Sequence, residues 1–259
     1  MLVAAAICPH PPLLLPGVTG AAVQLDPAAE LRAACREAVA AVTDAAPDVL
    51  VVIAGQDHPA GSTPDAVPHR EWDPAACDLG VERYTAGRVA GQRGTPRSPL
   101  RGGTSVLPLG LAVGQVLVDL AGWTGRRRLV SVPAAATVEH CLQLGRELAG
   151  VATRVGVVVL GDGSARRTIK APGYLDPRAH DLDALCEKGL RGDLTVLRAL
   201  DPGQCADLLV AGRAAWQVLA GLAEDAGPVA CVVHHDADPH GVRYLVASWM
   251  VDGAALTSD

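Results

Sequence analysis

RVGVVVLGDGSARR, residues 154–167, runs from a short apolar segment into a polar, glycine-rich loop. Valine fills the apolar half, which predicts a buried strand over Arg154–Leu160. Similar apolar runs predict strands at Leu2–Ile7, Asp48–Ala54, Arg128–Pro133, Val229–Val233 and Arg243–Trp249. Stretches rich in Ala and Leu predict helices at Pro27–Ala45, Leu109–Ala121, Val138–Ala149, Pro177–Leu190 and Pro202–Glu224. This alternation predicts an α/β fold with a central, mostly parallel or mixed sheet flanked by helices.

The length of the chain favours one domain. Its 259 residues suit a single large α/β domain over residues 1–259. Residues 55–108 are rich in Gly, Pro, Arg and Asp and show little periodicity. Strands and helices of one kind are predicted on both sides of this segment. We therefore interpret it as an irregular, elaborated loop region and not as a linker between two domains.

Composition and charge argue against several classes of protein. The formal charge of −6 and the pI near 5.7 give no broad positive field, so no nucleic-acid partner is expected. No run reaches the roughly 18 to 20 apolar residues of a membrane span, and the apolar start is broken from Pro9 onward, unlike a signal peptide. We expect no membrane partner and a cytoplasmic location. Seven cysteines without a CxxC pair argue against a disulfide framework and a zinc knuckle.

Function is expected beyond the carboxyl ends of the strands, because loops converge there in open α/β sheets. Polar loops follow four of the predicted strands, and three of these loops carry histidine. They begin at Cys8, Gly55, Gly161 and His234.

Several of these loop residues are candidate metal ligands. Two histidines and one carboxylate hold Fe(II) and leave positions open for substrate and dioxygen. His10 and His58 are the candidate imidazoles, and Asp236 or Asp238 is the candidate carboxylate. Three histidines and a water, with His240 as the third, would instead suit Zn(II).

A plainer interpretation stands beside the metal site. A histidine in a loop is usually a hydrogen-bonded polar residue, and the Asp-Pro and His-Gly pairs within residues 234–241 are ordinary turn chemistry. A solvated turn between two antiparallel strands therefore also explains that segment.

Four motifs carry a resemblance to a known family. Residues 7–14, ICPHPPLL, resemble the opening of class III extradiol ring-cleavage dioxygenases (LigB-like) and Memo-like proteins, where a strand ends in a metal-binding His. VVI at 51–53, leading to His58, is similar to the strand that delivers the second His. GDGSARR at 161–167 resembles the family's Gly-Asp-x-Ser-His segment, and PHGVRYLVA at 239–247 resembles its closing hairpin. The four matches occur in the family's order over nearly the whole chain.

The resemblance implies a single α/β domain, often a homodimer, and in catalytic members Fe(II)-dependent cleavage of a catechol-like ring. Two positions depart from the pattern. The proton-handling His would fall at Ala165, which cannot exchange a proton, and the metal-binding Glu would fall at about Ala237. Asp236 or Asp238 supplies a carboxylate only if the loop is shifted by one residue.

Three functions follow from these residues. The first is a metal-dependent oxidoreductase that acts on a small aromatic or oxygenated substrate through a degenerate Fe(II) site. The second is a non-catalytic, Memo-like binding or interaction protein, which needs no cofactor. The third is a metal-dependent hydrolase on the same scaffold, with Zn(II) as the metal.

Overall fold

A computed structural model describes residues 1–18, 28–56, 69–79 and 105–251. Its centre is a seven-stranded sheet in the order β3-β6-β2-β7-β1-β9-β8. The strands are β1 (Leu2–Cys8), β2 (Val49–Gln56), β3 (Arg70–Trp72), β6 (Arg126–Pro133), β7 (Val155–Leu160), β8 (Val229–Ala237) and β9 (Tyr244–Val251). Short strands β4 (Cys77–Asp78) and β5 (Ser105–Val106) pair with each other separately.

The main sheet is mixed. Strands β6, β2, β7 and β1 are parallel neighbours. Strands β2, β7 and β1 are almost fully buried, and β6 is buried from Leu129 to Pro133. The outer strands reverse direction, since β3 pairs antiparallel with β6, β9 with β1, and β8 with β9. Burial on both faces explains why the central strands are continuous apolar runs without alternation. The predicted fold class is confirmed.

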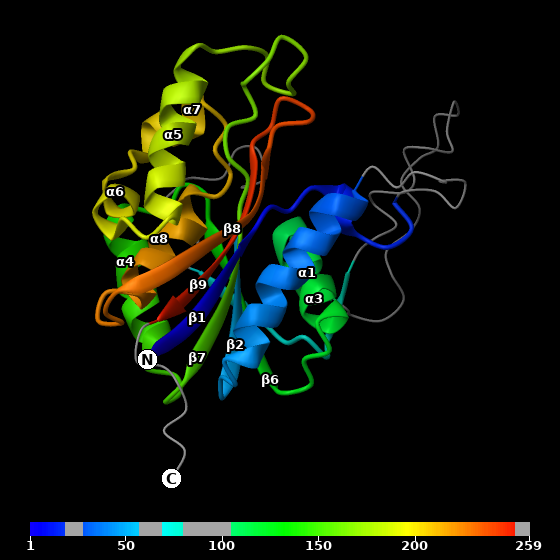
Figure 1. Cartoon of the computed structure of the whole chain (residues 1–259), viewed down its shortest axis with the longest axis vertical. Coiled ribbons are helices and arrows are strands. Elements are labelled where there is room, and N and C mark those ends of the chain that lie inside the picture. The colour runs from blue at the N-terminus through cyan, green and yellow to red at the C-terminus, as the bar shows by residue number, and fades with distance from the viewer. Residues whose placement is uncertain (19–27, 57–68, 80–104, 252–259) are drawn as a thin grey trace.

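Helices cover both faces of the sheet (Figure 1). One face, called the α1 face below, packs against α1 (Ala29–Asp44) and α3 (Leu109–Leu120). The other, called the α5 face, packs against α4 (Val138–Ala149), α5 (Arg178–Leu190), α6 (Leu194–Ala199), α7 (Pro202–Asp207) and α8 (Arg213–Leu222). A single turn, η1 (Pro12–Leu14), follows β1.

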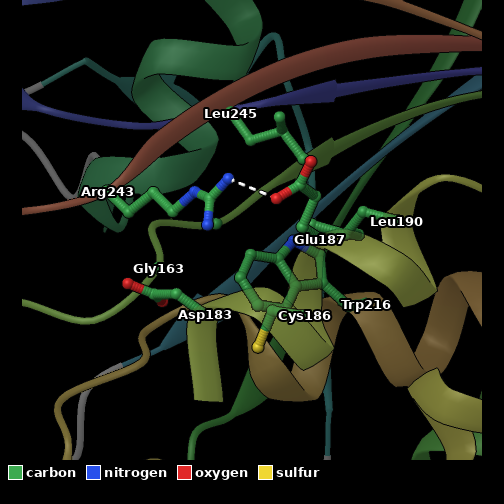
Figure 2. Close-up of a pocket in the computed structure, with 9 residues that line it drawn as sticks. Gly163, Asp183, Cys186, Glu187, Leu190, Trp216, Arg243 and Leu245 are labelled. Atoms are coloured by element: carbon green, nitrogen blue, oxygen red, sulfur yellow. Dashed lines mark hydrogen bonds and ion pairs between the residues drawn. The ribbon is translucent and has the colours of Figure 1, made fainter. Parts of the chain in front are cut away.

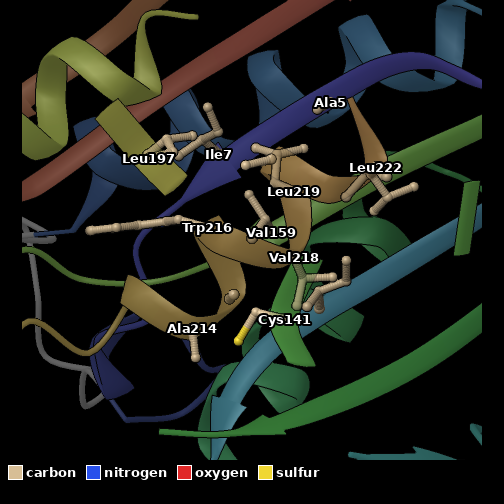
Figure 3. Close-up of a cluster of buried hydrophobic side chains, with 14 of the residues drawn as sticks. Ala5, Ile7, Cys141, Val159, Leu197, Ala214, Trp216, Val218, Leu219 and Leu222 are labelled. Carbon is tan, nitrogen blue, oxygen red and sulfur yellow. The ribbon is translucent and has the colours of Figure 1, made fainter. Parts of the chain in front are cut away.

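The core of the α5 face is centred on α8. Trp216 and Leu219 of this helix pack among buried residues of β1 and β7, such as Ile7 and Val159 (Figure 3). Every residue of α8 is buried. A helix that is buried all round has no solvated stripe, so α8 lies inside the α5 face and not on its surface.

The predicted helix over Pro202–Glu224 is in fact two helices. After α7 the chain turns at Leu209, whose φ is +54°, and α8 begins after Gly212. A leucine with positive φ cannot continue a right-handed helix. The sequence did not predict this break, because residues 208–211, LLVA, are as apolar as the flanking helices.

Two further properties concern the chain as a whole. Within the described residues, no helix is both long enough and apolar enough to cross a membrane. All seven cysteines are free, as the absence of paired spacing predicted.

Candidate functional site

A crevice lies beyond the carboxyl ends of β2 and β6. The next helix after β2 in the described part of the chain is α3, on the α1 face, whereas the helix after β6 is α4, on the α5 face. Neighbouring parallel strands whose helices lie on opposite faces leave a gap between their loops, and ligands of α/β proteins bind there. The backbone N–H of Ala134, just after β6, donates to the carbonyl of Gln56 at 3.1 Å and holds the two strand ends together.

One cavity of this crevice, called the His10 cavity below, has a volume of about 410 Å³. That volume lies within the range of pockets that hold small ligands. Its polar lining comes from His10 after β1, Gln56 at the end of β2 and Trp72 at the end of β3. Its apolar lining comes from Val106, Leu107, Pro108, Leu109, Ala134 and Ala211.

His10 is held by Asp162, which follows β7. The backbone N–H of His10 donates to Oδ1 of Asp162 at 2.8 Å, and Nδ1 of the His10 ring lies 3.5 Å from the same oxygen. This Nδ1 is buried and makes no hydrogen bond within the described residues. Asp162 also lies near Tyr244, whose pKa is raised to about 12 by burial and by the negative charge of Asp162.

Gln56 is oriented by a chain of hydrogen bonds. Nε1 of Trp72 donates to Oγ of Ser131 at 2.9 Å, and Oγ of Ser131 donates to Oε1 of Gln56 at 2.9 Å. Because Oε1 of Gln56 is the acceptor, its Nε2 amide group is left to donate to a ligand. The guanidinium of Arg70 lies 3.8 Å from the centre of the Trp72 ring and covers one of its faces.

The candidate carboxylates Asp236 and Asp238 lie in ion pairs with arginine. Asp236 accepts from Arg243 at 2.7 and 3.0 Å, and Asp238 accepts from Arg167 at 2.7 Å. Arg243 also bonds Glu187 on α5 at 2.7 Å, a contact that Figure 2 shows beside a small cavity. These ion pairs tie the β8–β9 hairpin to the α5 face of the molecule.

Arg167 extends this cluster to a buried carboxylate, Asp183 of α5. Its Nη1 donates to Asp183 at 2.9 Å, and the backbone N–H of Ser164 donates to the same carboxylate at 2.8 Å. Burial raises the pKa of Asp183, although both donors favour its anion. The cluster is therefore a structural ion-pair network that already uses Asp236 and Asp238.

A β-bulge at His234 determines which way Asp236 points. Val233 pairs with Ala247, but the next paired residue of β8 is His235, opposite Val246, so His234 is an extra residue. Asp236 is then opposite Leu245, which belongs to the core of the α5 face. His10 lies on the other side, because its ring approaches Gly110 of α3 on the α1 face. One inserted residue moves the side chain of every later residue of the strand to the opposite face of the sheet. Asp236 therefore points away from His10.

The other expected positions are occupied as follows. Ala237 is opposite Tyr244, whose side chain packs in the core of the α1 face, so a methyl group stands at the position where the resemblance led us to expect a carboxylate. Ala165 packs partly against the same core. His240 is exposed in the turn between β8 and β9, and His58 lies outside the described residues. Among the described residues no three His, Cys, Asp or Glu side chains gather as a metal site. These residues do not fit the family's iron site.

The sequence did not single out several residues of the crevice. Gln56 and Asp162 could have been found, since each is the second residue of a polar loop that follows a predicted strand. Trp72 could not, because its three-residue strand lies in the segment interpreted as irregular. Arg213 could not either, since a charged residue within a predicted helix is ordinarily on its exposed face, whereas here it is buried.

Comparisons with known proteins give no function. No protein-family model matches the sequence, and no curated protein matches it. One solved structure, of an uncharacterized protein from Escherichia coli K12, is similar over 96% of this chain and 99% of that chain, with 14% identity and a TM-score of 0.49. A likeness of this degree assigns neither a family nor an activity.

Proposed function

We propose that this protein binds a small aromatic or oxygenated molecule in the His10 cavity and that it does not cleave aromatic rings. The observation that carries the proposal is the meeting of three different side chains at one cavity of about 410 Å³. His10 offers an imidazole, Gln56 offers an oriented amide donor and Trp72 offers an aromatic surface. Such a set suits a planar molecule with hydroxyl groups.

Among the described residues, the site lacks the acid/base and the metal-binding carboxylate that ring cleavage needs. Ala165 cannot exchange a proton, and Ala237 cannot ligate a metal. Asp236 and Asp238 have the right chemistry, but their oxygens accept hydrogen bonds from Arg243 and Arg167. To bind a metal, either carboxylate would have to leave its arginine and give up charge-assisted hydrogen bonds. Binding without turnover therefore agrees best with the described residues.

A metal-dependent oxidoreductase is the second candidate. It is favoured by His10, whose imidazole lines the cavity and is a suitable ligand for Fe(II) or Zn(II). This function also needs His58 and a third ligand other than Asp236 and Asp238. A Zn(II) hydrolase makes the same demand on His10. For either function the cytoplasm is a suitable compartment, since seven free thiols persist in a reducing environment.

The test is a calorimetric titration with catechol and with protocatechuate, first without metal and then after anaerobic addition of Fe(II). We expect saturable binding without metal and no oxygen uptake with Fe(II). The Gln56→Glu variant keeps an oxygen to accept from Ser131 but loses the amide donor, and we expect it to bind catechol about tenfold more weakly, as for the loss of one good hydrogen bond.

Gln143→Glu is the matched control, since it makes the same change of charge on the exposed surface of α4. Equal affinity of the Gln56→Glu and Gln143→Glu variants would place the ligand elsewhere. Absence of saturable binding would disprove the proposal. Oxygen uptake that requires both Fe(II) and His10 would establish the second candidate instead.

A further inference from the structure

Arg213 is a buried cation at the start of α8. Only 2% of its surface is exposed. Its Nη1 donates to the carbonyl of Ala136 at 2.7 Å and to Oε1 of Gln217 at 2.9 Å, and its Nη2 donates to the carbonyl of Ala134. Gln217 is itself buried and bonds the carbonyls of Leu197 and Leu200. Arg213 therefore holds the loop between β6 and α4 against α8.

The charge of Arg213 has no negative partner in the part of the chain that the structure describes. Its three hydrogen bonds to oxygen are to neutral groups, the nearby Cys141 thiol is neutral as well, and no ion pair joins it to an Asp or Glu side chain among these residues. An uncompensated buried charge is unfavourable, and neutral carbonyls offset it only in part. The N-terminus of α8 adds partial positive charge at the same place. Both effects favour a bound anion.

The unused donors of Arg213 have the geometry that a carboxylate requires. A guanidinium has five N–H groups, and the three hydrogen bonds to oxygen leave the Nε–H and one Nη2–H without an oxygen acceptor, with the Cys141 thiol as a further, weaker neighbour of the group. Nε and Nη2 lie along one edge of the planar group. Two parallel N–H donors on one edge match the two oxygens of a carboxylate.

Arg213 lines a second cavity of the crevice, called the Arg213 cavity below, with a volume of about 640 Å³. Its other walls are mostly small and apolar. They include Ala134, Pro202, Cys205, Leu209, Val210 and Ala211. A ligand of this cavity must combine one anionic group with an apolar body.

We propose that the Arg213 cavity binds a small apolar carboxylic acid, with its carboxylate on the free edge of Arg213 and its hydrocarbon part against the apolar walls. Ala134 and Ala211 line this cavity and the His10 cavity alike, so the two are neighbours in one crevice. The carboxylate site does not depend on the function proposed for the His10 cavity, because the two cavities use different polar side chains.

The test compares benzoate with benzamide, its neutral isostere, by calorimetric titration of the full chain. We expect benzoate to bind at least about tenfold more tightly, since a charge-assisted pair of hydrogen bonds is lost with the amide. Arg213→Gln should abolish this preference, and Arg146→Gln on the exposed surface of α4 should preserve it. Equal affinities for benzoate and benzamide, or no binding of benzoate at 10 mM, roughly the limit of weak specific binding, would overturn the proposal.

A second variant keeps the test valid if Arg213→Gln does not fold. Ala206 is an exposed residue that lines the Arg213 cavity, so Ala206→Trp fills the cavity without touching the core. We expect this variant to lose benzoate binding, whereas Ala33→Trp on exposed α1 should keep it. Benzoate binding that survives Ala206→Trp would contradict the proposed location. Catechol titration of the same variant reports on the His10 cavity separately.

Discussion

Tyr244 begins β9 and lies near Asp162, the residue that holds His10. It is buried near Asp162, and it is paired with Ala237 across β8. A phenol and a methyl group therefore occupy the place where the resembled family would bring a carboxylate to its metal. The phenol is neutral at physiological pH, and burial together with the charge of Asp162 extends its neutral range to higher pH.

The raised pKa of Tyr244 predicts a dependence of stability on alkaline pH. An unfolded phenol ionises near pH 10, whereas Tyr244 in the fold ionises at about 12. The folded state thus holds the proton more tightly, and its stabilising contribution is complete below about pH 10 and is lost as the pH rises toward 12. We expect the free energy of unfolding of the Tyr244→Phe variant to fall by roughly 2 kcal/mol less than that of the wild type over this interval.

Urea denaturation at pH 10, 11 and 12 measures this difference. Buried thiols such as Cys141, whose pKa is raised to about 11, titrate in both proteins and cancel. Tyr174→Phe is the matched control because the Tyr174 side chain is exposed. If the free energy of unfolding of Tyr244→Phe falls with pH as steeply as that of the wild type, the raised pKa of Tyr244 is refuted.

At the scale of elements, helices α4 and α8 approach closely through glycines. A Cβ atom on Gly145 of α4 would overlap the carbonyl oxygen of Val218, and one on Gly221 of α8 would overlap the carbonyl oxygen of Leu142. Arg213 binds the loop before α4 from the start of α8, so this contact also sets the position of the Arg213 cavity.

Substituting Gly145 tests the contact. Gly145→Ala should destabilise the fold by about 1–3 kcal/mol, because the cost of overpacking exceeds the gain in helix propensity. Gly150→Ala at the end of the same helix should be nearly neutral, since its Cβ atom would lie an ordinary 3.6 Å from the nearest atom. Chemical denaturation of both variants makes the comparison. Equal free energies of unfolding of Gly145→Ala and Gly150→Ala would show that α4 and α8 can move apart without loss of stability.

The elements that sequence predicted well are the ones with strong local signals. Val138–Ala149 agrees with α4 at both ends, and its N-cap, Thr137, accepts from the N–H of His140. The sequence failed where tertiary contacts decide. Leu209 has a positive φ within an apolar run, and β3 is a strand only because it pairs with β6.

The candidate site could be predicted only in part for a similar reason. His10 directly follows a strand, so its place at the crevice follows from the strand pattern. The direction of Asp236 depends on the bulge at His234, and a bulge leaves no mark in the sequence. The buried state of Arg213 depends on Gln217 and on two carbonyls from a loop 77 and 79 residues away.

At the scale of the whole molecule, two apolar cores share one sheet. Five of the seven cysteines lie in these cores, each at most 3% exposed, and only Cys77 and Cys231 are partly exposed. The thiols therefore report on the integrity of both cores at once, since Cys8 and Cys35 belong to the α1 face and Cys141, Cys186 and Cys205 to the α5 face.

Reaction with Ellman's reagent tests this arrangement. We expect at most two thiols to react quickly in the native protein and all seven to react in urea. A reducing agent should leave the melting temperature unchanged, because no disulfide links the elements. Rapid reaction of three or more thiols in the native state would show that one core opens readily.

The bulge at His234 makes the number of residues in β8 as important as their identity. Removal of one residue there would restore regular pairing and would turn Asp236 from the α5 face to the α1 face, where His10 lies. The same step would take Asp236 away from Arg243. A shortening by a single residue thus exchanges an ion pair for a carboxylate at the crevice, so the chemistry of this edge of the sheet depends on strand length.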